Sequence, residues 1–571
     1  MSTPSRAQSP GTPMSMLPMP VASRAPRSRR ARALDTAASL LARLDQHEAA
    51  LYAPVTDMTS AKRLYYHQQQ YVQELTRSAM NAGAQLIELL QREARQAHAR
   101  QLPQMHSILL RLGSRTIDAP LTALAAWRDN EARHPHRAVR RAAPTDEPVH
   151  IRMMADDMLD RALTETYATV GAVWECATEL RVRRACAKWL AHLAQRYVMA
   201  LDAGLSMHDS WWPLEREAWR ITAANWFSRT ALDEPEQAYA YLGLAAVHRA
   251  EPLAALYFLC KSLQTVHPTP NAHEALHAWA MERTEGGTDP KSAVVQALAQ
   301  LILRNEDEVP FNEPLALDLL ETEWAELGVC ITGALLEFGH PHATLEARIL
   351  AAHGTPSHAR VDASQCVQTL ETFLQDAQAF CTPPLAPCDV LRLCEARGLS
   401  APLCHAIHLY LLLLQTALAE LASTPAPGVF VMLTLSFLQV LTLRTHIPAV
   451  DALCYVWKAA LPWDQLMTYV RREAVLDGTP SAEAQWRLAL AHSPDDWYFR
   501  GLSWPTWAPA VSALGSECET DMLAHRRATA LRARTRPDAT PTLMEGRHAR
   551  TTLVVALLHA QLANYDASSL A

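Results

Sequence analysis

Apolar residues recur at helical spacing along nearly the whole of this 571-residue chain, and this periodicity constrains the fold more than any other feature. In the segment 60–99, for example, Leu64, Tyr71, Leu75, Leu86 and Leu89 fall on one side of an α-helix. Glycine is scarce, at 18 residues, which disfavours a sheet-rich fold with many tight turns and the glycine loops that hold nucleotides. The sequence therefore predicts an all-α fold.

Segments rich in proline, glycine or arginine interrupt the helical pattern and divide the chain, which is too long for one compact core. We expect a disordered, basic, Pro/Ser-rich tail over 1–33, a helical bundle over 34–205, tetratricopeptide-type repeats over 206–285 and a helical-hairpin domain over 291–520. The last part, 521–571, is expected to hold a mobile Arg-rich segment over 524–550 and a terminal helix from Thr551 to Leu562.

Charge and cysteine content narrow the classes of function. The net charge of −7 and the pI near 6.4 argue against broad, non-specific affinity for duplex DNA. The 11 dispersed cysteines are typical of reduced intracellular thiols. The most apolar stretch, Val429–Leu443, is shorter than the ~20 residues that cross a bilayer, so we interpret it as a buried helix and expect no membrane partner.

A cluster of arginines near the N-terminus bears on localisation. It comprises Arg24, Arg27, Arg29, Arg30 and Arg32. Such a cluster is typical of a nuclear localisation signal, but a solvated basic tail has the same composition, and both interpretations stay open. We predict a nuclear protein, with shuttling to the cytoplasm as the alternative.

The segment 211–282 carries the pattern of a tetratricopeptide unit, in which two antiparallel helices pack through aromatic, Leu-Gly and small residues. The matching positions are, in the first helix, Tyr239, Leu242 and Gly243, and, in the second, Ala255, Leu259 and Ser262, with Pro268 ending the unit. An ordinary helical hairpin with a seam of small residues would give the same pattern, so this alternative stays open.

Two stretches, far apart in the chain, follow a shared order of motifs. The first runs through WFSRTALD from Trp226, YLGLAAV from Tyr241, LAALYFLCKSL from Leu253 and HPTPNA from His267. The second is SPDDWYFRGLSW, residues 493–504. They resemble the "WYRRA", "YNQLA", "YYYxRSLA" and "PFPxAxxNL" motifs and the later "PEDxxLRGF" element of the telomerase-activating "ever shorter telomeres" family and its nonsense-mediated mRNA decay relatives. Lys261 stands where that family usually has arginine.

The resemblance covers about residues 35–530 and implies both architecture and partners. It implies a 14-3-3-like bundle over 34–205, then tetratricopeptide repeats and stacked helical hairpins. It also implies binding of a phosphorylated protein partner, such as a decay or telomerase factor, and of telomerase RNA or single-stranded telomeric DNA. From the residues themselves, Asp495 and Asp496 can cap a turn, and Trp497 can anchor that turn to a helical core. A role in telomere maintenance and a role in mRNA decay both stay open.

Basic side chains recur along the helix expected over 174–201, and several fixed cations are what a phosphoserine dianion requires. The candidate phosphopeptide-binding residues are Arg181, Arg184, Lys188, His192 and Arg196. By the resemblance, Arg196 is the nearest equivalent of the family's phosphate-binding arginine, because HLAQRY here is similar to the stretch that precedes it. Where the family has another pocket lysine, this chain carries the amides of Gln68, Gln69 and Gln70. A solvated basic helix face is the alternative interpretation.

No residues in the sequence match a known catalytic motif, so we predict a non-catalytic adaptor with no catalytic residue, cofactor or metal. The thiols and imidazoles that lack zinc-site spacing, and that we interpret as core or surface groups, are Cys381, Cys388, Cys394, Cys404, His405 and His408. The alternatives are a truncated or degenerate PIN-type endoribonuclease relative and a generic tetratricopeptide interaction scaffold. The scaffold is favoured if the 493–504 element is a surface loop away from the helices.

Overall fold

The computed structural model is predominantly helical in the part of the chain that it describes. It describes residues 59–60, 62–70, 157, 167–168, 171, 174–175, 180–202, 212–283, 289–304, 317–340, 343, 345, 363–376, 387–443, 447–474, 481–490, 495–499, 502–503, 541–563 and 565. Of these residues 83% are helical and none lies in a strand, which confirms the all-α prediction.

Contacts along the chain divide it into two compact units, Met1–Glu179 and Leu180–Ala571. In the first unit, the described helical segment 62–70 buries Leu64 and Gln68, which lie one turn apart. Tyr65 Oη donates a hydrogen bond to a carboxylate oxygen of Asp157. The tail expected over 1–33 and most of the bundle expected over 34–205 lie outside the described residues.

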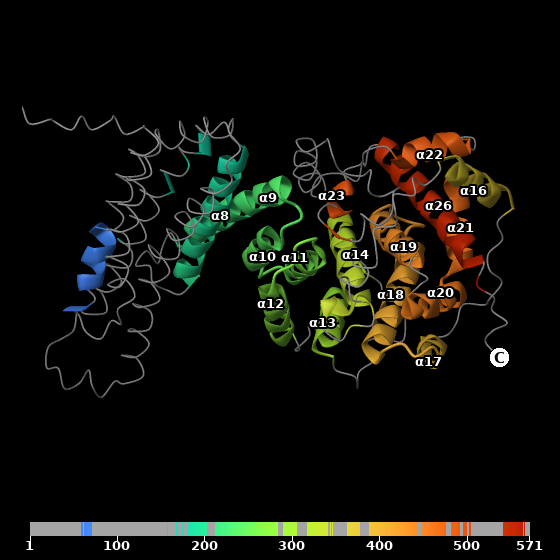
Figure 1. The fold of residues 1–571 in the computed structure, drawn as a ribbon, viewed down its shortest axis with the longest axis horizontal. Coiled ribbons are helices and arrows are strands. Elements are labelled where there is room, and N and C mark those ends of the chain that lie inside the picture. The colour runs from blue at the N-terminus through green and yellow to red at the C-terminus, as the bar shows by residue number, and fades with distance from the viewer. Residues whose placement is uncertain are drawn as a thin grey trace, which may run out of the picture. The chain divides into compact units, whose positions relative to one another are not determined.

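Sixteen α-helices and one 3-10 turn are described in the second unit (Figure 1). The first group comprises α8 (Leu180–Asp202), α9 (Trp212–Asp233), α10 (Ala238–Val247), α11 (Pro252–Gln264), α12 (Pro270–Met281), α13 (Pro290–Leu303), α14 (Glu321–Leu335) and the turn η3 (Glu337–Gly339). The second group comprises α16 (Ala363–Asp376), α17 (Pro387–Ala396), α18 (Ala401–Glu420), α19 (Gly428–Thr442), α20 (Pro448–Ala460), α21 (Trp463–Ala474), α22 (Ala482–Leu490), α23 (Asp496–Phe499) and α26 (Pro541–Ala563).

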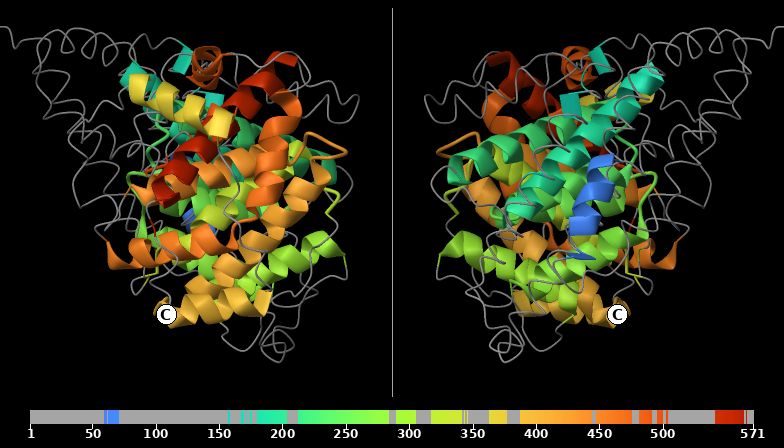
Figure 2. Two further views of the ribbon diagram at one scale, coloured as in Figure 1. Left: turned by 90° about the vertical axis from the view of Figure 1, so that its right-hand side faces the viewer. Right: turned by 90° about the vertical axis from the view of Figure 1, so that its left-hand side faces the viewer.

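The helices of the second unit pack in a row that Figure 1 shows from α8 to α26. Helix α9 contacts α8 and α10, α11 contacts α10 and α14, and α19 contacts α14 and α26. At the end of the row far from α8, helix α26 packs on α16, α19 and α22. Figure 2 shows α26 in red. One core of buried apolar side chains runs through the row from α8 to α26.

Helix α19 lies at the centre of this core, and all 15 of its residues are buried. Its hydroxyl groups are satisfied inside the helix: Thr434 Oγ1 donates to the Phe430 carbonyl at 2.9 Å, and Ser436 Oγ donates to the Met432 carbonyl at 2.7 Å. Such back-bonding lets polar residues enter a core without unpaired donors. The interpretation of Val429–Leu443 as a buried helix is therefore confirmed, apart from the half-exposed Leu443 that follows α19.

Several prolines that interrupt the sequence pattern mark the first turn of a helix. Eight of the described helices have a proline as their first or second residue: Pro213, Pro252, Pro270, Pro290, Pro387, Pro402, Pro448 and Pro541. The first backbone N–H groups of a helix have no partner within it, so a proline there removes nothing and presets the backbone angle. The breaks in the pattern are thus the helix boundaries.

The C-terminal helix is longer than the sequence predicts. We expected it to begin at Thr551 after a mobile segment, but α26 already begins at Pro541. The expectation was wrong for residues 541–550 because the basic residues there do not all face solvent. Arg547 and Arg550 are buried, and Arg547 forms ion pairs with two carboxylates.

Among the described helices, only α18 is long and apolar enough to cross a membrane. Its most apolar window is 72% buried by the rest of the protein. Tyr410 and Leu413 on this helix are fully enclosed, and α14, α17, α19 and α21 pack around it. In this structure α18 therefore has the environment of a core helix.

We predict that Gly243→Ala destabilises the protein by about 1–3 kcal/mol. A Cβ at this position of α10 would overlap the ring of Phe227 on α9. The matched control is Gly328→Ala on α14, where the nearest side-chain atom, Leu433 Cδ2, would lie at an ordinary 3.5 Å. The control should be neutral or stabilising, because alanine favours helix by up to about 1 kcal/mol. Urea unfolding of both variants measures the difference, and equal effects would show that the α9–α10 seam is not tight.

Candidate functional site

The basic residues of α8 that we predicted as a phosphopeptide site have different surroundings. Lys188 Nζ forms an ion pair with Glu234, which follows α9. The ring of His192 packs edge-on against Tyr239 at 4.6 Å between centroids, and against Phe227 at 5.9 Å. Lys188 and His192 therefore face α9 and α10.

The structure describes the other predicted residues of α8, Arg181, Arg184 and Arg196, only in part. Arg184 is half-buried, and its Nε atom is buried without a hydrogen-bond partner. Arg181 and Arg196 belong to α8, but their side chains lie outside the described part of the structure. The structure thus pairs Lys188 with the carboxylate of Glu234. Among the described basic residues of α8, Arg184 has a polar atom, Nε, without a hydrogen-bond partner.

The two stretches that carry the family resemblance meet in space. The backbone N–H of Ser503 donates to the Gln264 carbonyl at 2.7 Å, and Leu502 forms an antiparallel bridge with Thr265. The ring of Tyr498 in α23 lies edge-on to Tyr257 in α11, at 6.4 Å. The described residues of the 493–504 element, 495–499 and 502–503, are therefore docked on the end of α11, and Asp495, Phe499 and Leu502 are buried.

Helix α11 carries a buried lysine at the position where the sequence departs from the family pattern. Lys261 is fully enclosed. Its Nζ donates to Tyr257 Oη at 3.3 Å and lies 5.2 Å from the ring centre of Tyr241. Aromatic faces attract an amino group that carries a proton, so the two tyrosines provide suitable surroundings for a lysine side chain.

A buried cation, Arg547 on α26, pairs with the 493–504 element. Its guanidinium donates to both oxygens of Asp495, at 2.8 and 2.9 Å, and to Glu321 on α14 at 2.5 Å. Burial lowers the pKa of the Arg547 guanidinium, but attraction by Asp495 and Glu321 outweighs burial and raises that pKa above its ordinary value. The guanidinium of Arg547 thus connects α26, α14 and the 493–504 element, which are distant in the sequence.

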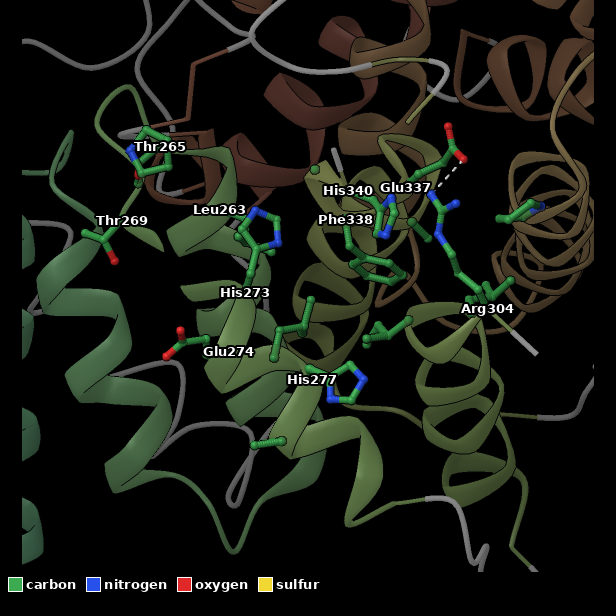
Figure 3. A pocket seen from close by; sticks show the side chains of 18 of the residues that line it. Leu263, Thr265, Thr269, His273, Glu274, His277, Arg304, Glu337, Phe338 and His340 are labelled. Atoms are coloured by element: carbon green, nitrogen blue, oxygen red, sulfur yellow. Dashed lines mark hydrogen bonds and ion pairs between the residues drawn. The ribbon is translucent and has the colours of Figure 1, made fainter. Parts of the chain in front are cut away.

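A groove of about 1180 Å³ opens beside the site where the two stretches meet (Figure 3). Its walls come from the end of α11 and the loop 265–269, from α12, from the end of α13, from η3, and from Pro402 and Ser503. The apolar lining includes Leu263, Leu276, Leu301, Ile302 and Phe338, and the imidazoles are those of His267, His273, His277 and His340. Figure 3 shows His273, His277 and His340 projecting toward the space beside Phe338.

The η3 wall of the groove has an unusual backbone. Glu337, Phe338 and Gly339 have φ values of 47°, 51° and 66°, in the left-handed region that only glycine enters readily. The buried carboxylate of Glu337 holds this turn, since it accepts from Ser400 Oγ at 2.9 Å and pairs with Arg304 at 3.4 Å. Strained backbone held in this way often marks a functional surface.

The cysteines and histidines that we considered for zinc are not gathered into one set. Cys394 and Cys404 are buried, and their mutual hydrogen bond, together with burial, raises the pKa of the Cys394 thiol far above its usual value. His408 is buried, while His405 is half-buried. Cys381 and the side chain of Cys388 lie outside the described residues. Within the part of the chain that the structure describes, no three His, Cys, Asp or Glu side chains could share a metal ion.

Comparison with known proteins leaves the resemblance as an expectation. The chain matches no protein-family model, and no curated protein matches it.

The groove is the feature that sequence analysis missed. Its histidines lie on a loop, on α12 and after η3, between residues 267 and 340, with no common spacing. Nothing in the sequence shows that the Glu-Phe-Gly turn before His340 is left-handed. The one available signal was the HPTPNA motif, whose His267 and Pro268 line the groove.

We predict that Arg547→Met destabilises the protein by about 3–5 kcal/mol, because it leaves the buried carboxylate of Asp495 unpaired. Adding Asp495→Asn should recover more than about 1 kcal/mol of that loss. The matched control is Arg487→Met, which removes an exposed pair with Glu483 and should cost about 0–1 kcal/mol. Urea unfolding measures all three, and a loss at Arg547 no larger than at Arg487 would contradict the structural role of the pair.

Proposed function

We propose that this chain is a non-catalytic helical adaptor, related to the telomerase-activating and nonsense-mediated decay family, that binds other macromolecules on its stacked helices. The observation that carries the proposal is the docking of the 493–504 element on α11, through the Ser503–Gln264 hydrogen bond and the Leu502–Thr265 bridge. Both stretches that resemble the family thus line one groove. A surface loop far from the helices would instead have favoured a generic interaction scaffold.

The packing of α9 to α13 supports the tetratricopeptide part of the proposal. Consecutive helices pack pairwise, α9 with α10, α10 with α11 and α12 with α13, and short connections join them. The seam positions predicted for the second helix, Ala255, Leu259 and Ser262, are all buried. Gly243 lets α10 approach Phe227 on α9 closely. A repeat of this kind stacks its pairs into an extended binding surface.

The proposed partner of α8 is a phosphorylated segment of a protein. Arg184 is a half-buried cation one turn before Lys188 on the same helix, and Lys188 is held by Glu234. A phosphate dianion is a stronger ligand for these cations than a single carboxylate, because it presents three acceptor oxygens. In this proposal, phosphate competes with Glu234 for Lys188. Nuclear localisation and binding of RNA or single-stranded DNA belong to the same proposal through the family resemblance.

We predict that Arg184→Gln and Lys188→Gln each weaken binding of a phosphoserine peptide library by about tenfold or more, the effect of losing one charge-assisted hydrogen bond. Glu234→Gln should act in the opposite direction and strengthen binding, because it releases Lys188. Neutral variants are preferable to Lys188→Glu, which would place two carboxylates together and disturb α8.

The measurement is fluorescence anisotropy with the phosphorylated library and with the same library after phosphatase treatment. Far-UV circular dichroism controls for folding. Unchanged affinity in all three variants would remove the 14-3-3-like assignment. Identical binding of both libraries would remove phosphate from the proposed partner.

A further inference from the structure

We propose that Cys394 and Cys404 form a thiol pair that peroxide oxidises to a disulfide, and that this disulfide loosens the η3 wall of the groove. The pair is thus a modification site that links the redox state of the chain to the shape of the groove. The proposal goes beyond the adaptor function proposed above. Its test needs no partner, so either proposal can fail without the other.

The turn between α17 and α18 brings the two thiols together. Cys394 lies in the last turn of α17, and Cys404 lies in the first turn of α18. Leu399 contacts both residues, because its N–H donates to the Cys394 carbonyl at 3.2 Å and its carbonyl accepts from Cys404 Sγ at 3.6 Å. The two thiols are also hydrogen-bonded to each other. The folded chain therefore already holds the two sulfur atoms in contact.

The two thiols differ in acidity, and this difference assigns their roles. The hydrogen bond from Cys394 lowers the pKa of the Cys404 thiol, whereas the same hydrogen bond, together with burial, raises the pKa of the Cys394 thiol far above its usual value. The thiolate, and not the thiol, is the nucleophile in cysteine chemistry. Cys404 is therefore the sulfur that attacks peroxide, and Cys394 is the sulfur that completes the disulfide.

The oxidation has two steps and balances with peroxide as the oxidant. The Cys404 thiolate attacks one peroxide oxygen and the O–O bond breaks, which gives a sulfenic acid and a hydroxide that takes up the proton lost by Cys404. The Cys394 sulfur then attacks the Cys404 sulfur, and the hydroxyl group leaves as water with the Cys394 proton. The two thiols lose two electrons, and one peroxide is reduced to two waters.

The position of the pair beneath a surface turn gives a small oxidant its route. Both side chains are at most 2% exposed, but Glu395, Gly398 and Ala401 around them are exposed. Surface turns open more readily than packed helices do, because few buried contacts must be broken. Peroxide reaches the pair when this turn opens.

A second thiol pair in the same chain provides a comparison. Cys260 on α11 and Cys330 on α14 are also hydrogen-bonded to each other. Every residue of 255–265 and of 327–338 is buried, so these thiols lie inside the core and away from any exposed turn of their helices. An oxidant would have to separate two core helices to reach them, and such openings approach the free energy of global unfolding. We expect this pair to stay reduced while Cys394 and Cys404 react.

Ser400 connects the thiol pair to the groove. It lies in the α17–α18 turn, and its Oγ donates to the carboxylate of Glu337 at 2.9 Å. Figure 3 shows this carboxylate facing Arg304 at the groove. A disulfide bond is only about 2.05 Å long, so its formation draws α17 and α18 together and displaces the turn that carries Ser400. Glu337 then loses one of the partners that hold the left-handed backbone of η3.

The first part of the test detects the disulfide. The full chain is treated with hydrogen peroxide, alkylated with N-ethylmaleimide and digested without reduction. Mass spectrometry should find a peptide pair joined through Cys394 and Cys404, but none joined through Cys260 and Cys330. Dithiothreitol should remove the link. Cys388→Ser, which replaces another cysteine of α17, should leave the link in place.

The second part measures η3 by hydrogen–deuterium exchange. The N–H groups of Gly339 and His340 donate to the carbonyls of Leu336 and Glu337 in the reduced chain. After oxidation they should exchange about fivefold faster, the effect of losing one ordinary hydrogen bond. Dithiothreitol should restore the slower rate, and this comparison uses the unsubstituted chain throughout.

Three variants assign the effect to the proposed residues. Cys394→Ser and Cys404→Ser should each abolish both the link and the effect of peroxide on η3. Ser400→Ala should still form the link, but its η3 amides should exchange rapidly in the reduced chain and change no further on oxidation. Urea unfolding confirms that each variant folds.

Three results would overturn the inference. The first is the absence of a link between Cys394 and Cys404 in the folded, peroxide-treated chain. The second is equal linking of Cys260 and Cys330, which would show that the surface turn gives no selectivity. The third is a link that forms without any change of exchange at η3.

Discussion

One residue, Gln264, joins three parts of the second unit that meet beside the groove: α11, α14 and the 493–504 element. Its side-chain amide donates to the Val329 carbonyl at 3.2 Å and accepts from Thr332 Oγ1 at 3.0 Å, both on α14. Its own carbonyl accepts from the Ser503 backbone. Gln264 and its partners on α14 are buried, so replacing the glutamine would leave polar atoms there without partners. The position of α11 against α14 and the docking of the 493–504 element depend on this set of hydrogen bonds.

The close approach of α11 and α14 gives this arrangement its geometry. Gly333 on α14 faces Cys260 on α11, and an added Cβ would lie 3.2 Å from the Cys260 sulfur. Neighbouring cysteines Cys260 and Cys330 are buried as small core residues, and burial raises the pKa of the Cys330 thiol well above its ordinary value. Small side chains at this seam bring the backbones near enough for the Gln264 amide to span them.

The local sequence pattern predicted the helices well. It could not predict the contacts between segments that are distant in the sequence. The apolar run at Val429 became α19, and the small residues at Ala255 and Ser262 became a buried seam, because both follow from helical periodicity. Arg547 was predicted as part of a mobile segment, since a single sequence does not show that Asp495 and Glu321 would reach it. The groove was missed for the same reason: its walls are adjacent only after folding. On α8, the spacing of the basic residues alone could not predict that Lys188 and His192 would contact α9 and α10.

The central position of α19 has a consequence for synthesis of the chain. Helix α26, which covers one side of α19, begins about a hundred residues after α19 ends. Ribosomes add roughly 5–20 residues per second, so α19 leaves the exit tunnel several seconds before its cover does. During that interval an almost wholly apolar helix is open to water on one side, the kind of nascent segment that chaperones shield.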